Sequence, residues 1–165
     1  MAQPGQARVP AYEYVTHWRL AAPVERVWQA LVEVEAWPRW WPYVRQVQAL
    51  RAGDADGVGA VHRITWTSRL PYGFTLDVEG VESQRHRLLR GRASGDLEGE
   101  GLWLLQPEAG GAETAVRYTW RLDLNTRWMR MTAPLMAPVF RWNHEGVMRG
   151  GGEGLARHLG APPRP

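Results

Sequence analysis

Residues 21–42 read AAPVERVWQALVEVEAWPRWWP, and the spacing of apolar residues in this stretch decides the fold. Pro23 suits the first turn of a helix, where its missing amide hydrogen is not needed. The apolar residues that follow recur at spacings of three and four, at Val24, Val27, Trp28 and Leu31. This spacing predicts a short amphipathic helix directly after Pro23.

A second, shorter element follows within the same stretch. Pro38 and Pro42 bound it closely, so the sequence allows only about one turn of helix. The element carries three tryptophans, Trp37, Trp40 and Trp41. We expect that so short an element cannot bury all three beneath itself.

The two helices interrupt a series of predicted strands. Residues Tyr12 to Leu20 alternate in polarity before the first helix, which predicts a strand. Six further strands are predicted after the second helix, separated by turn residues such as Gly95-Asp96. They run over Val44 to Arg51, Val61 to Ser68, from Phe74 onward, Arg87 to Ser94, Leu97 to Gln106 and Glu113 to Leu124.

The C-terminal segment changes to helical spacing. We expect this helix to begin near Pro134 or Pro138 and to end at Gly160, a residue type that suits a helix C-terminus. Three consecutive glycines, residues 150–152, lie inside it, and each costs about 1 kcal/mol relative to alanine. They indicate either a break in the helix or a close approach of the helix to another part of the chain.

The order of elements predicts an α+β fold in one domain over residues 11–160. We expect about seven antiparallel strands to form a curved sheet that wraps around the C-terminal helix, with a cavity between them. Residues 1–10 and 161–165 contain few apolar residues and several prolines, and we expect both to be flexible tails.

The composition excludes several classes of function. The chain has no Cys, which rules out disulfides, thiolate metal sites and a cysteine nucleophile. All 20 basic residues are Arg, so no lysine Schiff base can form. The formal net charge is only +3 and no Arg cluster is long, so nucleic acid is not expected as a partner. No apolar run is long enough to span a membrane, and no stable membrane insertion is expected.

The chain contains ten Trp but only two Phe. A core made only for packing would use Leu, Val and Ile, whereas an indole carries an N–H that needs a partner when buried. The tryptophans therefore indicate either an amphipathic pocket or simple core packing, and the sequence leaves both interpretations open.

The chain resembles the START-like (SRPBCC) superfamily, in its polyketide cyclase/dehydrase and lipid-transport branch. The resemblance covers about residues 12 to 160, and its later segments are similar to those of a bacterial subgroup. The matching segments are Trp18, APVERVWQAL (22–31), WPRWW (37–41), GVG (57–59), SRLPY (68–72), ASGDLEG (93–99), WNHEGVM (142–148) and GLA (154–156). It implies a helix-grip fold whose cavity binds lipids, sterols, polyketides or hormones.

Three functions remain open at this stage. The first is binding of an apolar or aromatic small molecule, lipid-like or polyketide-like, in a Trp-rich internal cavity. The second is a polyketide cyclase or dehydratase of the aromatase type, a lyase or isomerase that works without a metal. The third is a structural or interaction domain that binds no ligand. Few ionisable residues point inward in the predicted elements, which favours binding over catalysis.

Candidate site residues follow from the predicted strands and the C-terminal helix. We expect the ligand to contact Trp40, Trp66, Arg69, Tyr72, Trp103, Tyr118, Trp120, Phe140, Asn143 and Val147. Arg69 and Tyr72 flank Pro71 in a turn, either at the cavity mouth, where an arginine orients an anionic group, or as plain exposed turn residues. For Asn143 the sequence leaves open a ligand contact or a backbone-capping amide.

Catalytic residues are not defined by the sequence, and the weak candidates are His144, Arg69 and Tyr72. A neutral imidazole at His144 would suit a general base. However, His144 lies about 100° around the helix from Asn143, so we expect its ring at the edge and exposed to water. The HExxH zinc motif fails because position 148 is Met, and no metal site and no cofactor are expected. We expect a cytoplasmic monomer or weak homodimer.

Overall fold

The computed structural model describes residues 12–71, 73–123 and 127–161. Residues 1–11, Tyr72, residues 124–126 and residues 162–165 lie outside these ranges. The two expected tails therefore lie outside them, except for Ala161. The elements follow the predicted order closely. They are β1 (Tyr12–Leu20), α1 (Val24–Val32), η1 (Val34–Arg39), β2 (Val44–Arg51), β3 (Val61–Trp66), β4 (Phe74–Gln84), β5 (Leu88–Gly95), β6 (Glu98–Glu108), η2 (Ala109–Gly111), β7 (Glu113–Asp123) and α2 (Arg127–His158).

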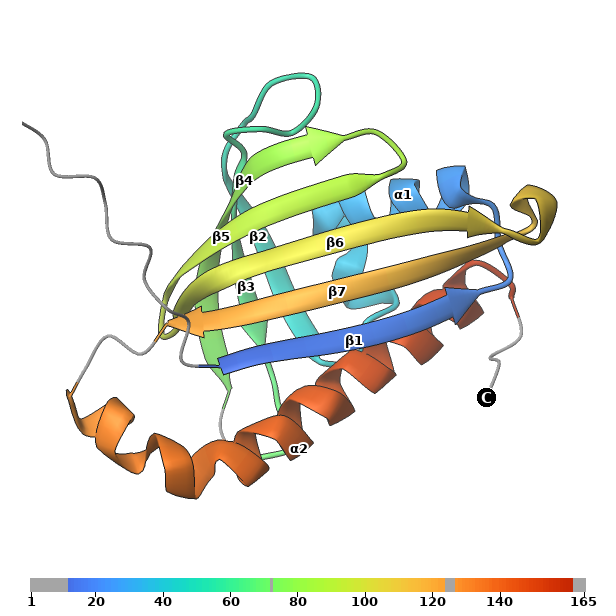
Figure 1. Cartoon of the computed structure of the whole chain (residues 1–165). Helices are drawn as coiled ribbons and strands as arrows, with labels where there is room; N and C mark the ends of the chain where they lie inside the picture. The colour runs from blue at the N-terminus through green and yellow to red at the C-terminus, as the bar shows by residue number, and fades with distance from the viewer. Residues whose placement is uncertain (1–11, 72, 124–126, 162–165) are drawn as a thin grey trace, which may run out of the picture.

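The seven strands form one antiparallel sheet with the order β1-β7-β6-β5-β4-β3-β2. The sheet curves, and the long helix α2 runs along its open side next to β1 (Figure 1). The predicted α+β helix-grip fold is therefore confirmed. Because β1 and β2 are the two edges, the concave face that meets α2 is built from residues far apart in the sequence.

Strand register places aromatic side chains on this concave face. Tyr118 of β7 pairs with Thr16 of β1 on one side and with Trp103 of β6 on the other. Trp120, two residues further along β7, pairs with Tyr14 and Gly101. Alternate residues of a strand point to the same face, so the tyrosines and tryptophans of β1, β6 and β7 share the side that faces α2.

Helix α2 begins earlier than expected. It starts at Arg127 rather than at Pro134 or Pro138, and both prolines lie inside the helix. The periodicity located the helix correctly, but proline is a poor marker of its start because tertiary contacts can hold a helix through a proline. The helix is also continuous through residues 150–152, so the alternative of a break there is wrong.

The glycines of α2 are contact points for aromatic rings and backbone. A Cβ on Gly151 would lie 2.5 Å from Cε2 of Trp41, and a Cβ on Gly152 would lie 2.8 Å from Nε1 of Trp18. At Gly154 the Cβ would lie 1.7 Å from the carbonyl oxygen of Trp40. The glycines therefore allow the helix to approach β1 and the end of η1 more closely than any larger residue would permit.

The three tryptophans of residues 37–41 are more enclosed than the sequence led us to expect. Trp37, Trp40 and Trp41 are all buried, with exposed fractions of 8%, 4% and 1%. Their own element is too short to cover them. The remaining cover comes from α2, whose glycine-lined surface accepts the ring of Trp41 and the backbone of Trp40. Sequence reasoning considered only the short element itself.

Candidate functional site

Seven aromatic side chains pack together under the second half of α2. We call them the aromatic cluster: Trp18, Trp37, Trp40, Trp41, Trp66, Trp103 and Tyr118. Trp41 lies at the centre, stacked on Trp40 at 5.4 Å between ring centroids and edge-on to Trp66 at 5.0 Å. Trp103 and Tyr118 approach to 4.1 Å. Rings at these separations touch one another, so the cluster is a closely packed part of the hydrophobic core.

Only some of the indole N–H groups in the cluster have a hydrogen-bond acceptor. Trp41 Nε1 donates a hydrogen bond to the carbonyl oxygen of Val147 at 2.9 Å, and Trp37 Nε1 donates to that of Leu31 at 3.2 Å. The indole nitrogens of Trp18, Trp40 and Trp66 are buried without a partner among the described residues. The cluster therefore packs as a core, as one of the two interpretations of the tryptophans predicts, and it leaves three indole donors unpaired among the described residues.

The first half of α2 is tied to the sheet at both sides. On the β1 side, the hydroxyl of Tyr12 donates a hydrogen bond to the carbonyl oxygen of Ala133. On the other side, the backbone N–H of Arg69, in the β3–β4 turn, donates to Oδ1 of Asn143 at 2.9 Å. The two ties hold the helix against the sheet near β1 and near the β3–β4 turn.

Several apolar side chains in this region are only partly buried. We use the name open end of the concave face for the partly exposed set formed by Phe74 and Val78 on β4, Trp120 on β7, and Met136 and Phe140 on α2. Phe74 stacks on Trp66 at 6.2 Å, which joins the open end to the aromatic cluster. Trp120 lies over Gly99, where a Cβ would be 3.1 Å from its ring. Apolar surface that remains partly exposed between a sheet and a helix suits an apolar ligand.

Tyr14 and His144 form the edge of the open end on the β1 side. Their rings stack at 4.8 Å with an interplanar angle of 25°. The Tyr14 hydroxyl and His144 Nε2 are both buried, and neither has a hydrogen-bond partner among the described residues. Burial lowers the pKa of His144 to about 4, so its ring is neutral near pH 7. The expectation of a water-exposed His144 is wrong, because Tyr14 covers the edge of the helix.

The β3–β4 turn is clasped against α2 by Arg69. Its guanidinium lies over the ring of Trp142, and its side chain crosses Gly146, where a Cβ would lie 2.2 Å from Arg69 Cδ. Asn143 accepts the Arg69 backbone N–H, so of the two roles that the sequence left open, its Oδ1 fills the capping one. Tyr72, the other candidate of this turn, lies outside the described residues.

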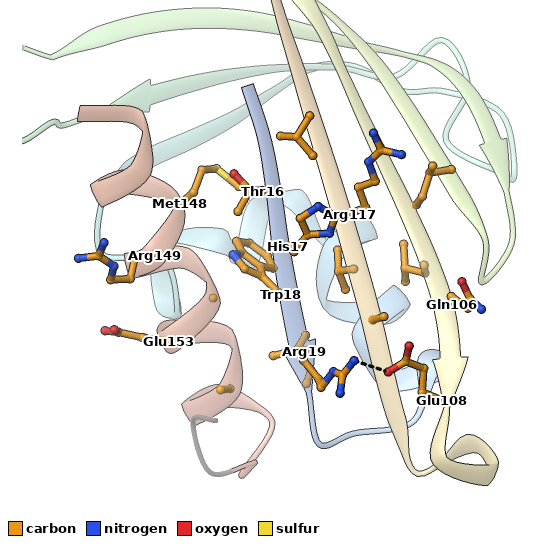
Figure 2. A pocket seen from close by; sticks show the side chains of 18 of the residues that line it. Thr16, His17, Trp18, Arg19, Gln106, Glu108, Arg117, Met148, Arg149 and Glu153 are labelled. Carbon is orange, nitrogen blue, oxygen red and sulfur yellow. Dashed lines mark ion pairs between the residues drawn. The ribbon is translucent and has the colours of Figure 1, made fainter. Parts of the chain in front are cut away.

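A groove of about 1170 Å³ lies elsewhere, along the exposed edge of β1 (Figure 2). Its walls carry both charge signs, and Arg19 forms an ion pair with Glu108 at 3.2 Å. Trp18 and Met148 contribute apolar surface to it. None of the predicted site residues is among those that line this groove. Its mixed charge is unlike the apolar cavity that the sequence predicts.

The predicted ligand contacts divide into two groups in space. Trp40, Trp66, Trp103, Tyr118 and Val147 belong to the buried region around the aromatic cluster. Trp120, Phe140, Arg69 and Asn143 lie at or beside the open end. Of the second group, the structure joins Arg69 and Asn143 directly. Trp40 and Trp103 face other aromatic rings.

Sequence reasoning missed Tyr14 as a site residue. It identified the alternation of β1 but assigned no role to the tyrosine, since the partner of Tyr14 lies 130 residues away on α2. The one available signal was phase. Tyr14 shares a face with Trp18 and Leu20, and a hydroxyl on an otherwise apolar face indicates a polar contact inside the fold.

The described ranges 12–71, 73–123 and 127–161 contain no group of three or more His, Asp or Glu side chains arranged to hold a metal ion. They also contain no helix that is long and apolar enough to cross a membrane.

Comparison with known proteins matches the chain to one protein family. The family described as polyketide cyclase/dehydrase and lipid transport matches residues 13–160. No curated protein matches the chain in sequence.

Solved structures agree with this match. A START superfamily protein from Mycobacterium smegmatis has a TM-score of 0.71 at 13% identity, covering 90% of this chain and 97% of its own. The Zhui aromatase/cyclase from a Streptomyces species has a TM-score of 0.69 at 14% identity, covering 90% and 93%. A protein from Thermus thermophilus has a TM-score of 0.68 at 19% identity, covering 89% and 99%. At these identities the likeness concerns the fold.

Proposed function

The chain belongs to the polyketide cyclase/dehydrase and lipid-transport family, and from this premise we propose that it binds an apolar or aromatic small molecule at the open end of its concave face. Membership supports a hydrophobic ligand-binding or polyketide-processing role.

One observation carries the proposal. Phe74, Val78 and Trp120 of the sheet and Phe140 of α2 are apolar side chains that stay partly exposed. Leaving an apolar side chain partly in contact with water costs about 25 cal/mol for each Å² that could be buried. A flat apolar ligand between Trp120 and Phe140 removes that cost, and it needs no rearrangement of the aromatic cluster.

The aromatic cluster then serves as the fixed wall of the site. Trp41 is fixed by its hydrogen bond to Val147. Trp66 stacks on Phe74 and so connects the cluster with the open end. A rigid wall lowers the entropy cost of binding, because few side chains need to become ordered when the ligand arrives.

Two measurements test the proposal. Native mass spectrometry of the purified protein would reveal a ligand that copurifies with it. Titration with polycyclic phenols and with fatty acids should change the intrinsic tryptophan fluorescence saturably. Trp120→Phe should remove part of that change, since Trp120 borders the open end. Trp28→Phe is the matched control, because Trp28 is buried on α1 and packs against His86, away from the site.

An absence of saturable change with every probe, together with a protein that carries no copurified ligand, would contradict the proposal. An unchanged response in Trp120→Phe combined with a reduced response in Trp28→Phe would place the ligand elsewhere in the molecule.

A second candidate function is polyketide cyclisation or dehydration at the same position. The observation that favours it is the neutral imidazole of His144 beside the Tyr14 hydroxyl, a pair that suits proton transfer to and from an enolisable chain. His144→Gln distinguishes the two functions. In an enzyme this change abolishes turnover and leaves binding intact. A carrier has no turnover to lose, and the variant should still retain an apolar ligand.

A further inference from the structure

Tyr14 and His144 carry polar atoms that the fold itself does not use. The Tyr14 hydroxyl and His144 Nε2 are both enclosed and lack a hydrogen-bond partner among the described residues. Tyr14 is 9% exposed. A buried polar group without a partner is destabilising and uncommon in folded proteins, so two of them on stacked neighbouring rings call for an explanation.

The surroundings of the pair are aromatic and nearly free of charge. Tyr12 stacks on Tyr14 at 6.0 Å, which extends the stack along β1. Trp120 pairs with Tyr14 across the strands, and Phe140 lies one helical turn before His144. The charged group that faces Tyr14 from α2 is Arg141, whose positive charge partly offsets the effect of burial on the Tyr14 pKa.

We propose that the Tyr14 hydroxyl and His144 Nε2 form a polar subsite that binds the hydroxyl group of a neutral phenolic ligand. The inference rests on the proposed function and specifies its ligand class. A hydroxyl both donates and accepts a hydrogen bond, so it can pair with a tyrosine hydroxyl and an imidazole nitrogen together.

Two features select a phenol among hydroxyl compounds. The pair belongs to a stack of flat rings that runs from Tyr12 through Tyr14 to His144, and flat rings pack best on an aromatic ligand. Burial also disfavours charge on both partners, since it raises the pKa of Tyr14 and lowers that of His144. The subsite therefore suits an uncharged hydroxyl rather than a carboxylate or a phosphate.

The experiment compares two probes that differ in one hydroxyl group. Binding of 2-naphthol and of naphthalene to the full chain is measured by calorimetry near pH 7. We expect 2-naphthol to bind about tenfold more tightly or more, because its hydroxyl satisfies two atoms that naphthalene leaves unpaired. Tyr14→Phe and His144→Phe should each reduce this ratio toward one, because each removes one of the two atoms that bind the hydroxyl group.

Tyr12→Phe is the matched control. It removes the same group from the same strand face, but the Tyr12 hydroxyl is already engaged by Ala133, so the ratio should persist. Nitrogen-15 NMR of the His144 ring gives an independent readout, and Nε2 should shift with 2-naphthol and not with naphthalene. If His144→Phe does not fold, Tyr14→Phe and the NMR shift decide the matter.

Equal affinity for the two probes, or a hydroxyl preference that survives Tyr14→Phe, would overturn the subsite while the proposed function stands. Failure of both probes to bind would count against the subsite and against the proposed location of the ligand together.

Discussion

The guanidinium carbon of Arg69 lies 3.8 Å from the centre of the Trp142 ring, so a turn of the sheet is fastened to the outer surface of the long helix. The fastening has two more parts. Asn143 accepts the backbone N–H of Arg69, and Gly146 leaves room for the arginine side chain to cross the helix. These three contacts form a clasp that holds the β3–β4 turn against α2.

Arg69→Ala should loosen the β3–β4 turn. A cation–π contact at an exposed site contributes about 0.5–1 kcal/mol, so we expect a fall in stability of that size. The sharper readout is amide hydrogen exchange, which should accelerate at residues 67–71 and leave β7 unchanged. Arg63→Ala is the control, because Arg63 pairs with Asp77 on the exposed face and has no contact with the clasp. Equal acceleration in both variants would mean that Arg69 does not fasten the turn.

Gly151→Ala should destabilise the protein, although the same change in an ordinary helix stabilises it by about 1 kcal/mol. The added Cβ would lie 2.5 Å from Trp41 Cε2, and the ring cannot retreat because its indole nitrogen is bonded to Val147. We expect a net loss of about 1–3 kcal/mol in denaturant unfolding.

Gly146→Ala provides the contrast on the same helix. Its Cβ would meet the side chain of Arg69, which can swing into solvent, so stability should change little while exchange at the β3–β4 turn increases. Equal losses for Gly146→Ala and Gly151→Ala would show that the effect does not depend on the contact with the buried Trp41 ring.

Trp41→Phe should cost about 3 kcal/mol or more. The change removes the hydrogen bond to Val147 and part of a ring that is 1% exposed at the centre of the aromatic cluster. Trp142→Phe, on a ring that is 45% exposed, is the control and should cost under about 1 kcal/mol. A small loss for Trp41→Phe would mean that the cluster repacks around the vacancy.

Most of the fold could be predicted from local pattern. The bounds of β1 and β2 agree with the predicted strands to the residue. For β1 the reason is alternating polarity, which is a strong signal on a half-buried strand. The start of α2 could not be predicted in this way. Pro134 and Pro138 argue for a boundary in local terms, and only tertiary contacts such as Tyr12 with Ala133 hold the helix through them.

The candidate site was harder to predict from the sequence, because it too depends on contacts between residues far apart in the chain. Whether Trp40 faces a ligand or another ring depends on Gly154 of α2, more than a hundred residues away, which allows the helix to approach. The burial of His144 depends in the same way on Tyr14. Helical phase gave the correct position of His144 on the helix edge, but it carries no information about which strand covers that edge.

Acid should destabilise the protein through His144. Its pKa is about 4 in the folded chain because burial disfavours the charged imidazolium, whereas an unfolded histidine titrates at about 6.5. Between these two values the unfolded chain binds more protons than the folded one, so stability falls as pH falls. The total loss is about 3 kcal/mol; it begins below about pH 7 and is nearly complete at about pH 4.

Urea unfolding between pH 7 and pH 4 measures this effect, and His144→Phe should flatten the dependence. His62 acts in the same direction, since burial lowers its pKa too, so a smaller slope should remain in the variant. His17→Gln removes an exposed histidine from β1 and serves as the control.

A ligand bound to the Tyr14–His144 pair should steepen the pH dependence of stability in the wild type, because protonated His144 can no longer accept a hydrogen bond. The same slope in the wild type and in His144→Phe would show that the imidazole is hydrated, and that it is not shielded by Tyr14.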